Sequence, residues 1–290
     1  MTSVDVGTVE RTAREARRLR FLRRYLLAII GAAIVVLWAL VALFAPAIAL
    51  QPFDAVNLGD RLIAPGWAHP FGTDELGRDV FSRVVYGARV SLPTGVAVVF
   101  IGGVVGTAFG ALAAFSSPRI DGLMMRITDL FLCFPPLILA MAITAALGVG
   151  WGNTILAMIV VWWPKYARVA RSLVLVQRSH DYVDAARALG YGRGRIVFRH
   201  IVPNTVGPLV TLLTLDIGNA IITFAGLSFL GLGVVPPTPE WGAMVSEGRS
   251  LIKEWWVSVF PGFAIFSVCL GFNFLGDGIR DWLDPRARQR

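Results

Sequence analysis

Several side chains in this sequence could support catalysis, but none has the spacing that catalysis needs. The only lysines, Lys165 and Lys253, do not follow glycine, so the sequence contains no G-x-x-x-x-G-K-[ST] phosphate-binding loop. The histidines at positions 69, 180 and 200 are far apart and match no metal-ligand spacing. Ser228 lacks the second glycine of a nucleophile turn, and the two cysteines stand in apolar stretches. We therefore expect a chain that is not an enzyme and that holds no metal or cofactor.

Asp216 is a second candidate, because it lies inside a long apolar stretch. A carboxylate at the centre of a membrane helix costs about 2.5–3.5 kcal/mol, so it should face the helix bundle, a partner helix or water. In one interpretation Asp216 lines a translocation path with Asn219 and Asn273, where it could contact an amino group of a solute. In the other it makes a buried polar contact with Asn219 or a neighbour. Both interpretations are open.

The third candidate is a short arginine-rich stretch at 181–203, DYVDAARALGYGRGRIVFRHIVP. Its spacing predicts a two-turn amphipathic helix, in which Asp181 caps the first turn and Gly190 ends the last. Four residues at i, i+3, i+4 and i+7 share one face: Tyr182, Ala185, Ala186 and Leu189. This small apolar face suits docking on another protein, or it belongs to an ordinary loop helix between two spans.

The elements that carry these residues are very apolar. Of the 290 residues, 56% are hydrophobic and 16% charged, and the mean hydropathy is +0.65. Residues 25–53 and 90–118 contain no charged residue, and each run exceeds the roughly 20 residues that cross a bilayer. A third run, 130–164, is too long for one crossing, and its glycines divide it into a hairpin. The sequence predicts an all-α polytopic membrane protein.

Six transmembrane helices are expected, at about 25–50, 90–115, 127–147, 154–176, 206–233 and 257–279. The second carries glycines at 102, 106 and 110, a spacing that lets another helix approach closely. In the fourth, three cations recur every third residue, at 165, 168 and 171. They would snorkel to the inner interface or form part of a cytoplasmic docking surface. Outside the spans, Thr73 and Thr238 are expected to cap helices.

The distribution of basic residues predicts the orientation. With the N-terminus inside and six spans, the cytoplasmic segments hold 21 of the 27 Lys and Arg. The positive-inside rule then places both termini in the cytoplasm and explains the net charge of +8 without nucleic acid as a partner. The expected organisation is a basic cytoplasmic segment at 1–24 that can contact membrane lipid, a first transmembrane helix at 25–50, an external segment at 51–89, a five-helix core at 90–280 with a cytoplasmic loop at 177–204, and a basic cytoplasmic tail at 281–290.

Two sets of residues resemble a known family. Asp184-Ala185-Ala186, with Gly190 and then Pro203, resembles the EAA loop of ABC-importer permeases, with mild departures at positions 184, 200 and 202. The longer block HPFGTDELGRDVFSRVVYGARVSL, at 69–92, resembles the C-type permease subunit of dipeptide, oligopeptide and nickel ABC importers. FLGLGVVPPTPEWGAMVSEGR, FPGFAIF and NFLGDGIRDWLDPR resemble the same subunits, so the likeness covers about residues 69–290.

The resemblance implies a type I ABC-importer permease of the bacterial inner membrane, which carries short peptides or similar small solutes. It implies a B-type permease partner, two ABC ATPase subunits that hold ATP and Mg²⁺, and an extracytoplasmic solute-binding protein. In that family the loop is a cytoplasmic helix that docks on the ATPase, so the resemblance assigns coupling to Tyr182, Val183, Asp184, Ala185, Ala186, Arg187, Leu189 and Gly190. The rival hypothesis is a secondary transporter or channel that uses Asp216 as an ion or proton site.

Overall fold

The computed structural model describes residues 6–283, with side chains from residue 25 onward except that of residue 193. Over this range helices are the regular elements, and no strand forms. Short 3-10 turns cover Leu58–Asp60 and Gly248–Ser250, and a π-helical turn covers Val197–Ile201. The α-helices are α1 (Val6–Leu43), α2 (Ala45–Ile48), α3 (Val80–Phe115), α4 (Pro118–Leu132), α5 (Pro136–Leu147), α6 (Trp151–Arg178), α7 (Asp181–Ala188), α8 (Arg193–Ile196), α9 (Val202–Phe229), α10 (Trp241–Glu247) and α11 (Trp256–Leu283).

Four helical stretches of the described chain are long and apolar enough to cross a bilayer: Tyr25–Leu43, Val80–Phe115, Gly194–Phe229 and Trp256–Leu283. The bent pair α4 and α5 makes a fifth if it counts as one span. Helix α6 is long enough, but its four cations lower its mean hydropathy.

The predicted third span, 127–147, is not a single helix. Helix α4 ends at Leu132, α5 begins at Pro136, and the two axes are bent by 88°. Two consecutive prolines, Pro135 and Pro136, cause this break, because neither has an N–H for the helical ladder and each disfavours helical geometry in the residue before it. The predicted first span at 25–50 is also divided, into α1 and the four-residue α2.

Both predicted helix caps outside the spans are wrong. Helix α3 begins at Val80, where the carboxylate of Asp79 accepts a hydrogen bond from the Ser82 N–H at 2.8 Å. Thr73 instead joins two loop segments: its hydroxyl accepts from the Ile63 N–H at 2.8 Å. Helix α10 is capped by Glu240, which accepts from the Ala243 N–H at 2.9 Å.

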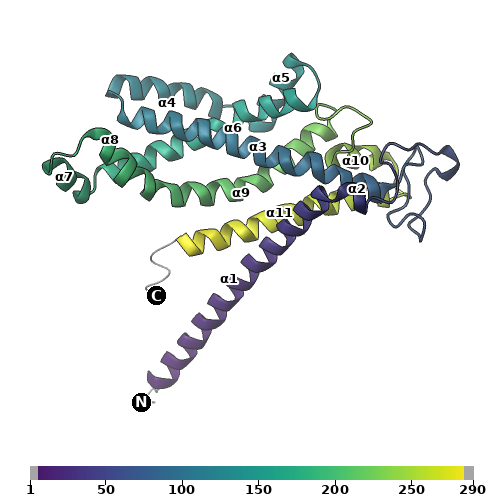
Figure 1. The fold of residues 1–290 in the computed structure, drawn as a ribbon, viewed down its shortest axis with the longest axis horizontal. Helices are drawn as coiled ribbons and strands as arrows, with labels where there is room; N and C mark the ends of the chain where they lie inside the picture. Colours follow the sequence, from purple (N-terminus) through teal and green to yellow (C-terminus); the bar gives the residue numbers. More distant parts are fainter. Residues whose placement is uncertain (1–5, 284–290) are drawn as a thin grey trace, which may run out of the picture.

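The glycine row of the second predicted span makes the expected close helix contact. Helix α3 lies along α6 (Figure 1), with its glycines against the α6 backbone. A Cβ added to Gly106 would lie 2.2 Å from the carbonyl oxygen of Trp163, and one added to Gly110 would lie 2.0 Å from that of Ala167. Only glycine permits this separation, so the prediction is confirmed.

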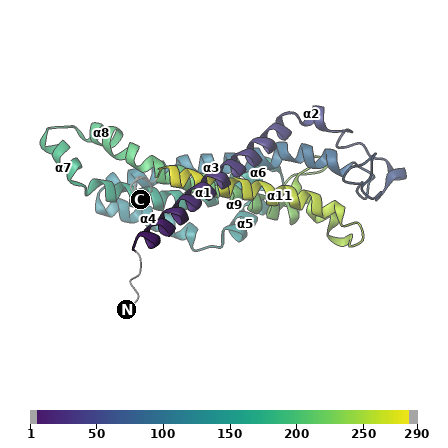
Figure 2. The same ribbon diagram turned by 90° about the horizontal axis from the view of Figure 1, so that it is seen from below.

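Helix α1 packs on the last helix, α11, also through small residues. A Cβ on Gly31 would lie 2.7 Å from the Gly271 carbonyl oxygen, and the Trp38 indole N–H donates to the Ser267 hydroxyl at 2.9 Å. Figure 2 shows α1 crossing α11 diagonally, and Figure 1 shows its N-terminal half extending away from the other helices. The first and last spans therefore form one layer beside the α3, α6 and α9 group.

Ion pairs attach α4 to α6. Arg171 donates to both oxygens of Asp121 at 2.6 Å, and Arg168 pairs with Asp129. These two cations were expected to snorkel to the membrane surface or to join a docking surface. In the structure a carboxylate of the same chain pairs with each of them.

Candidate functional sites

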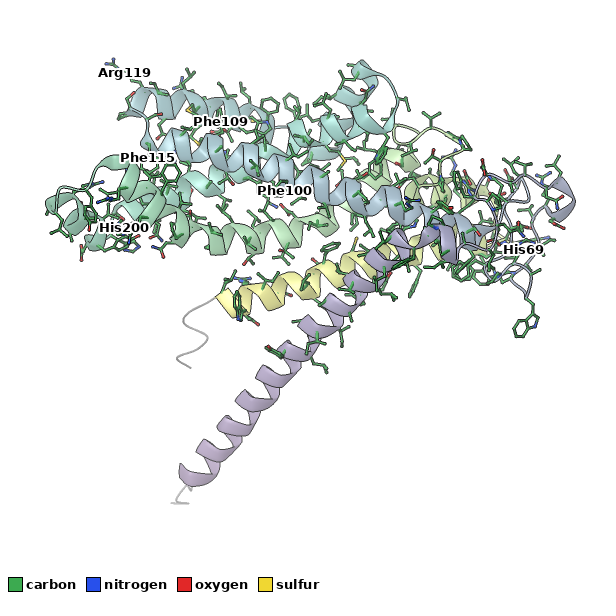
Figure 3. The ribbon with its side chains drawn as sticks, viewed as in Figure 1. His69, Phe100, Phe109, Phe115, Arg119 and His200 are labelled. Carbon is green, nitrogen blue, oxygen red and sulfur yellow. The ribbon has the colours of Figure 1, made fainter. Side chains whose placement is uncertain are left out.

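Helix α7 forms one end of the molecule, together with α8 (Figure 1), and the loop of residues 51–79 lies at the opposite end. Figure 3 labels His200 at the first end and His69 at the second. The helix begins one residue earlier than expected, with His180 at the N-cap, and Asp181 is its first residue. Its C-terminus is as predicted. Gly190 has φ +78°, its N–H donates to the Arg187 carbonyl at 2.9 Å, and the Tyr191 N–H reaches the Ala186 carbonyl at 3.1 Å. This pair of backbone hydrogen bonds is a Schellman motif, which needs the left-handed backbone that glycine adopts.

A small apolar cluster fixes α7 to the ends of the long helices. Val183 and Ala186 are buried against four other buried residues: Ala114 of α3, Val174 of α6, Ile196 and Ile201. The predicted single face of α7 is thus divided. Ala186 faces its own chain and not a partner, because the bend after Arg178 turns that side of α7 back onto the bundle. Val183, which the pattern placed off the apolar face, supplies the other buried contact.

The exposed side of α7 keeps the remaining apolar residues. Leu189 is 73% exposed and Tyr182 is 38% exposed, and Ala185 and Gly190 are also open to solvent. Asp184 and Arg187 form an exposed pair at 2.7 Å, of a kind that stabilises a helix by only about 0.3–0.5 kcal/mol. Both remain on the outer rim of the helix.

Phe198, which the sequence analysis did not select, adds to this end of the molecule. It lies in the turn Val197–Ile201 and is 77% exposed, although its neighbour Ile196 is buried in the cluster below α7. The helical spacing used for residues 182–189 does not reach this turn. The one available signal was its type, because a large aromatic side chain in an arginine-rich loop is unusual unless something covers it.

The second predicted site, around Asp216, is a compact buried polar cluster. Asp216 is buried and lies in the middle of α9. It accepts hydrogen bonds from Lys165 Nζ at 2.7 Å, from the Tyr166 hydroxyl at 2.9 Å and from Asn219 Nδ2 at 3.3 Å. The polar contact with Asn219 is therefore present, but the main partner is Lys165, which was expected at the inner membrane interface or on a docking surface. Asn273 on α11 is exposed and has no hydrogen bond to this cluster among the described residues.

A third polar cluster, at the opposite end from α7, went unnoticed in the sequence. Asp74 accepts from Arg78 at 2.7 Å and from Arg83 at 2.5 Å, and both arginines also donate to Glu247 of α10. Asp74, Arg78 and Arg83 are buried. The network joins the loop of residues 51–79 and the start of α3 to α10. Its only sequence signal was the four-residue spacing of Asp74 and Arg78, which is common on helices and turns alike.

The arrangement of these sites fits a transport subunit, and comparison with known proteins decides the family. Residues 106–289 match the family model of the binding-protein-dependent transport system inner membrane component. The chain belongs to this family. The resemblance to the C-type permease subunits is confirmed, and the chain is a multi-pass permease subunit of an ABC importer in the inner membrane. The family is a transport component and not a catalytic enzyme. Membership of this family favours the ABC-importer permease over the rival hypothesis of a secondary transporter or channel that uses Asp216.

Relatives in this family are similar over most of their length. The probable D,D-dipeptide transport system permease protein DdpC of Escherichia coli K12 is 45% identical over 262 residues, which are 90% of this chain and 88% of that protein. The dipeptide transport system permease protein DppC of Alkalihalophilus pseudofirmus is 43% identical, over 92% of this chain and 88% of its own. The glutathione transport system permease protein GsiD of Escherichia coli is 45% identical, over 93% and 89%.

Solved structures share the fold at lower identity. A chain of the MetNI methionine ABC transporter in an inward-facing conformation aligns with TM-score 0.60 and 20% identity, over 70% of this chain and 97% of its own. A chain of an amino acid ABC transporter aligns with TM-score 0.53 and 17% identity, over 72% and 95%. These likenesses establish an ABC-importer permease fold for the core of the chain.

Proposed function

We propose that this permease subunit pairs with a second, B-type permease to enclose a path for short peptides or similar small solutes. The support is the level of identity to DdpC, DppC and GsiD, whose names assign them D,D-dipeptides, dipeptides and glutathione. These solutes share a peptide-like backbone with at least one free carboxylate. A solute-binding protein on the outer side would deliver the ligand, and nucleic acid has no part in the scheme.

We propose six spans with both termini in the cytoplasm, with α6 completing the set. Helix α6 is 28 residues, about 42 Å at 1.5 Å per residue, which is long enough to cross. Its cations at 165, 168 and 171 are each paired with an aspartate of α4 or α9. The pairing reduces the cost of placing them at membrane depth. The preference of basic residues for the predicted inner segments supports the same orientation.

ATP and Mg²⁺ would be held by two partner ATPase subunits, and α7 would be the surface on which one of them docks. This assignment rests on one observation: α7 has one side buried against its own chain and another side exposed to solvent. Val183 and Ala186 fix the helix to the ends of α3 and α6, and Leu189 projects into solvent at the tip. A helix seated in this way transmits a push to the spans without bending. Tyr182, Leu189 and Phe198 would be the apolar anchors, and Asp184 and Arg187 would lie at the polar rim.

The test compares Leu189→Asp with Leu189→Met in the complete transporter. Aspartate places a charge in the docking contact without disturbing the buried cluster, and methionine keeps the apolar contact. An anchor residue is worth about 2 kcal/mol, so Leu189→Asp should reduce uptake and substrate-stimulated ATPase activity about thirtyfold, with normal amounts in the membrane. Leu189→Met should remain close to the parent. Uptake by Leu189→Asp at the parental rate would refute the coupling assignment.

The buried position of Ala186 changes what its substitution would report. Ala186→Arg would force a cation into the cluster of Val174 and Ile201 and detach α7 from the bundle. Loss of transport in that variant would follow from disorder of the helix and would not by itself identify an ATPase contact. Leu189 is therefore the more informative position.

A further inference from the structure

The pair of Lys165 and Asp216 lies at an unusual depth. Each is the fifteenth residue of a 28-residue helix, Lys165 in α6 and Asp216 in α9. At 1.5 Å per residue both are about 20 Å from the ends of their helices. Charged groups at such depth face a bundle interior, a partner protein or a water-filled cavity, because exposure to lipid is expensive.

The two partners differ in access. The Asp216 side chain is 3% exposed, and its two oxygens accept from Lys165, Tyr166 and Asn219. It has no open side on which to receive a cation from solution. The Lys165 side chain is 47% exposed and donates one of its three hydrogen bonds to Asp216. The group available at the open side is thus an ammonium and not a carboxylate.

Asn219 extends the open side. It is exposed, and its amide nitrogen donates to Asp216, which orients the side chain next to Lys165. Its amide oxygen has no hydrogen bond among the described residues, and neither do the two remaining donors of Lys165. A carboxylate only accepts hydrogen bonds, so the groups that could bind one here are the two remaining N–H donors of Lys165 and the second amide N–H of Asn219.

We propose that Lys165 and Asn219 form a transit site for the terminal carboxylate of the transported solute, with Asp216 and Tyr166 as positioning residues. This inference rests on the proposed function, because it requires a solute with a free carboxylate. Asp216 already neutralises Lys165, so the ligand carboxylate is held by hydrogen bonds and by a partly compensated charge. Such a site binds weakly enough to release the ligand, which transport requires.

The test measures charge selectivity in the complete transporter, reconstituted in proteoliposomes with saturating loaded binding protein. The probes are dialanine and dialanine amide, which differ only in the terminal carboxylate. A charge-assisted hydrogen bond supports a preference of about tenfold for dialanine in the parent protein. Lys165→Gln should bring the ratio of the two uptake rates close to one, and Lys165→Arg should keep part of the preference.

Two further variants guard against structural effects. The double variant Lys165→Gln, Asp216→Asn removes both charges, so no unpaired carboxylate stays buried, and it should also lose the preference. Arg168→Gln is the matched control, because Arg168 lies one turn further on the same helix, with a side chain 53% exposed, and it should keep the preference. Equal preference in the parent and in the double variant would overturn the site, as would equal loss in Arg168→Gln.

The surroundings of Lys165 are tested by labelling. With Cys133 and Cys269 replaced by serine, Lys165→Cys should react with a membrane-impermeant thiol reagent, and dialanine during turnover should slow the reaction. Absence of reaction would mean that residue 165 faces lipid. Loss of the second permease during purification of the Lys165→Gln variant would mean that Lys165 pairs with a carboxylate of that partner. Either result overturns the transit site alone. If the parent protein takes up neither probe, the proposed dipeptide substrate falls, and the transit site falls with it.

Discussion

Replacing Gly110 by alanine should separate α3 from α6 and destabilise the protein. The added Cβ would lie 2.0 Å from the carbonyl oxygen of Ala167 and 2.8 Å from its carbonyl carbon. Both neighbours are backbone atoms, so no side chain can rotate away. To restore an ordinary contact the helices must separate locally by about 1 Å, and overpacking of this kind typically costs about 1–3 kcal/mol.

Gly122→Ala provides the matched control. Gly122 lies inside α4, and a Cβ added there meets nothing within 4 Å. Both substitutions replace a helical glycine by alanine, so both gain up to about 1 kcal/mol of helix propensity. The difference in the free energy of unfolding between the two variants therefore isolates the clash at Gly110, and it should be about 1–3 kcal/mol.

Thermal melts of the purified protein in detergent measure this difference. For a chain of this size a loss of 1 kcal/mol lowers Tm by about 2–4 °C, so Gly110→Ala should melt roughly 2–12 °C below Gly122→Ala. Gly110→Ser should resemble Gly110→Ala, because its Cβ occupies the same position. Equal Tm values for Gly110→Ala and Gly122→Ala would refute the close approach of α3 and α6.

Three further perturbations test other parts of the structure. Lys165→Met leaves the buried carboxylate of Asp216 without its cation and should destabilise by about 3 kcal/mol, whereas adding Asp216→Leu should restore much of the loss; equal melts for the single and double variants would contradict the ion pair. Gly190→Pro removes the N–H that bonds to Arg187 and cannot adopt φ +78°, so uptake should be lost at normal membrane levels, and parental uptake would contradict the role of the Schellman motif. Burial raises the pKa of the Glu240 carboxyl, so its contribution to stability is full below the pKa of an unfolded glutamate and is lost as pH rises through the raised folded value. Tm should fall over that window, and Glu240→Gln should flatten the fall; an unchanged slope would contradict the raised pKa of Glu240.

Much of the fold could be predicted because the determining patterns are local. Long apolar runs identify spans without reference to any other part of the chain, and four helical stretches of the described residues are long and apolar enough to cross a bilayer. The glycine row of α3 also predicted a close helix contact, because a helix surface without side chains in a membrane mainly serves close packing. Gly190 marked the end of α7 for a similar reason, since the left-handed conformation there excludes most other residues.

Helix starts and the single-helix third span were less predictable. Thr73 and Thr238 are good cap residues by type, but Asp79 and Glu240 cap α3 and α10. The Thr73 hydroxyl instead bonds to Ile63 and Asp60 in the loop. The prolines that break the third span, Pro135 and Pro136, are visible in the sequence. A continuous apolar run conceals it, because hydropathy measures transfer from water and carries no information on backbone geometry.

The sequence by itself determined the class of the protein, the approximate spans and the family resemblance, because these depend on composition, residue spacing and short motifs. Only the tertiary structure decided which face of α7 is buried and which cation neutralises Asp216. The reason is that a helical pattern specifies which residues share a face but not what that face contacts. Lys165 and Asp216 are 51 positions apart in the chain and 2.7 Å apart in space, and no local pattern contains that distance.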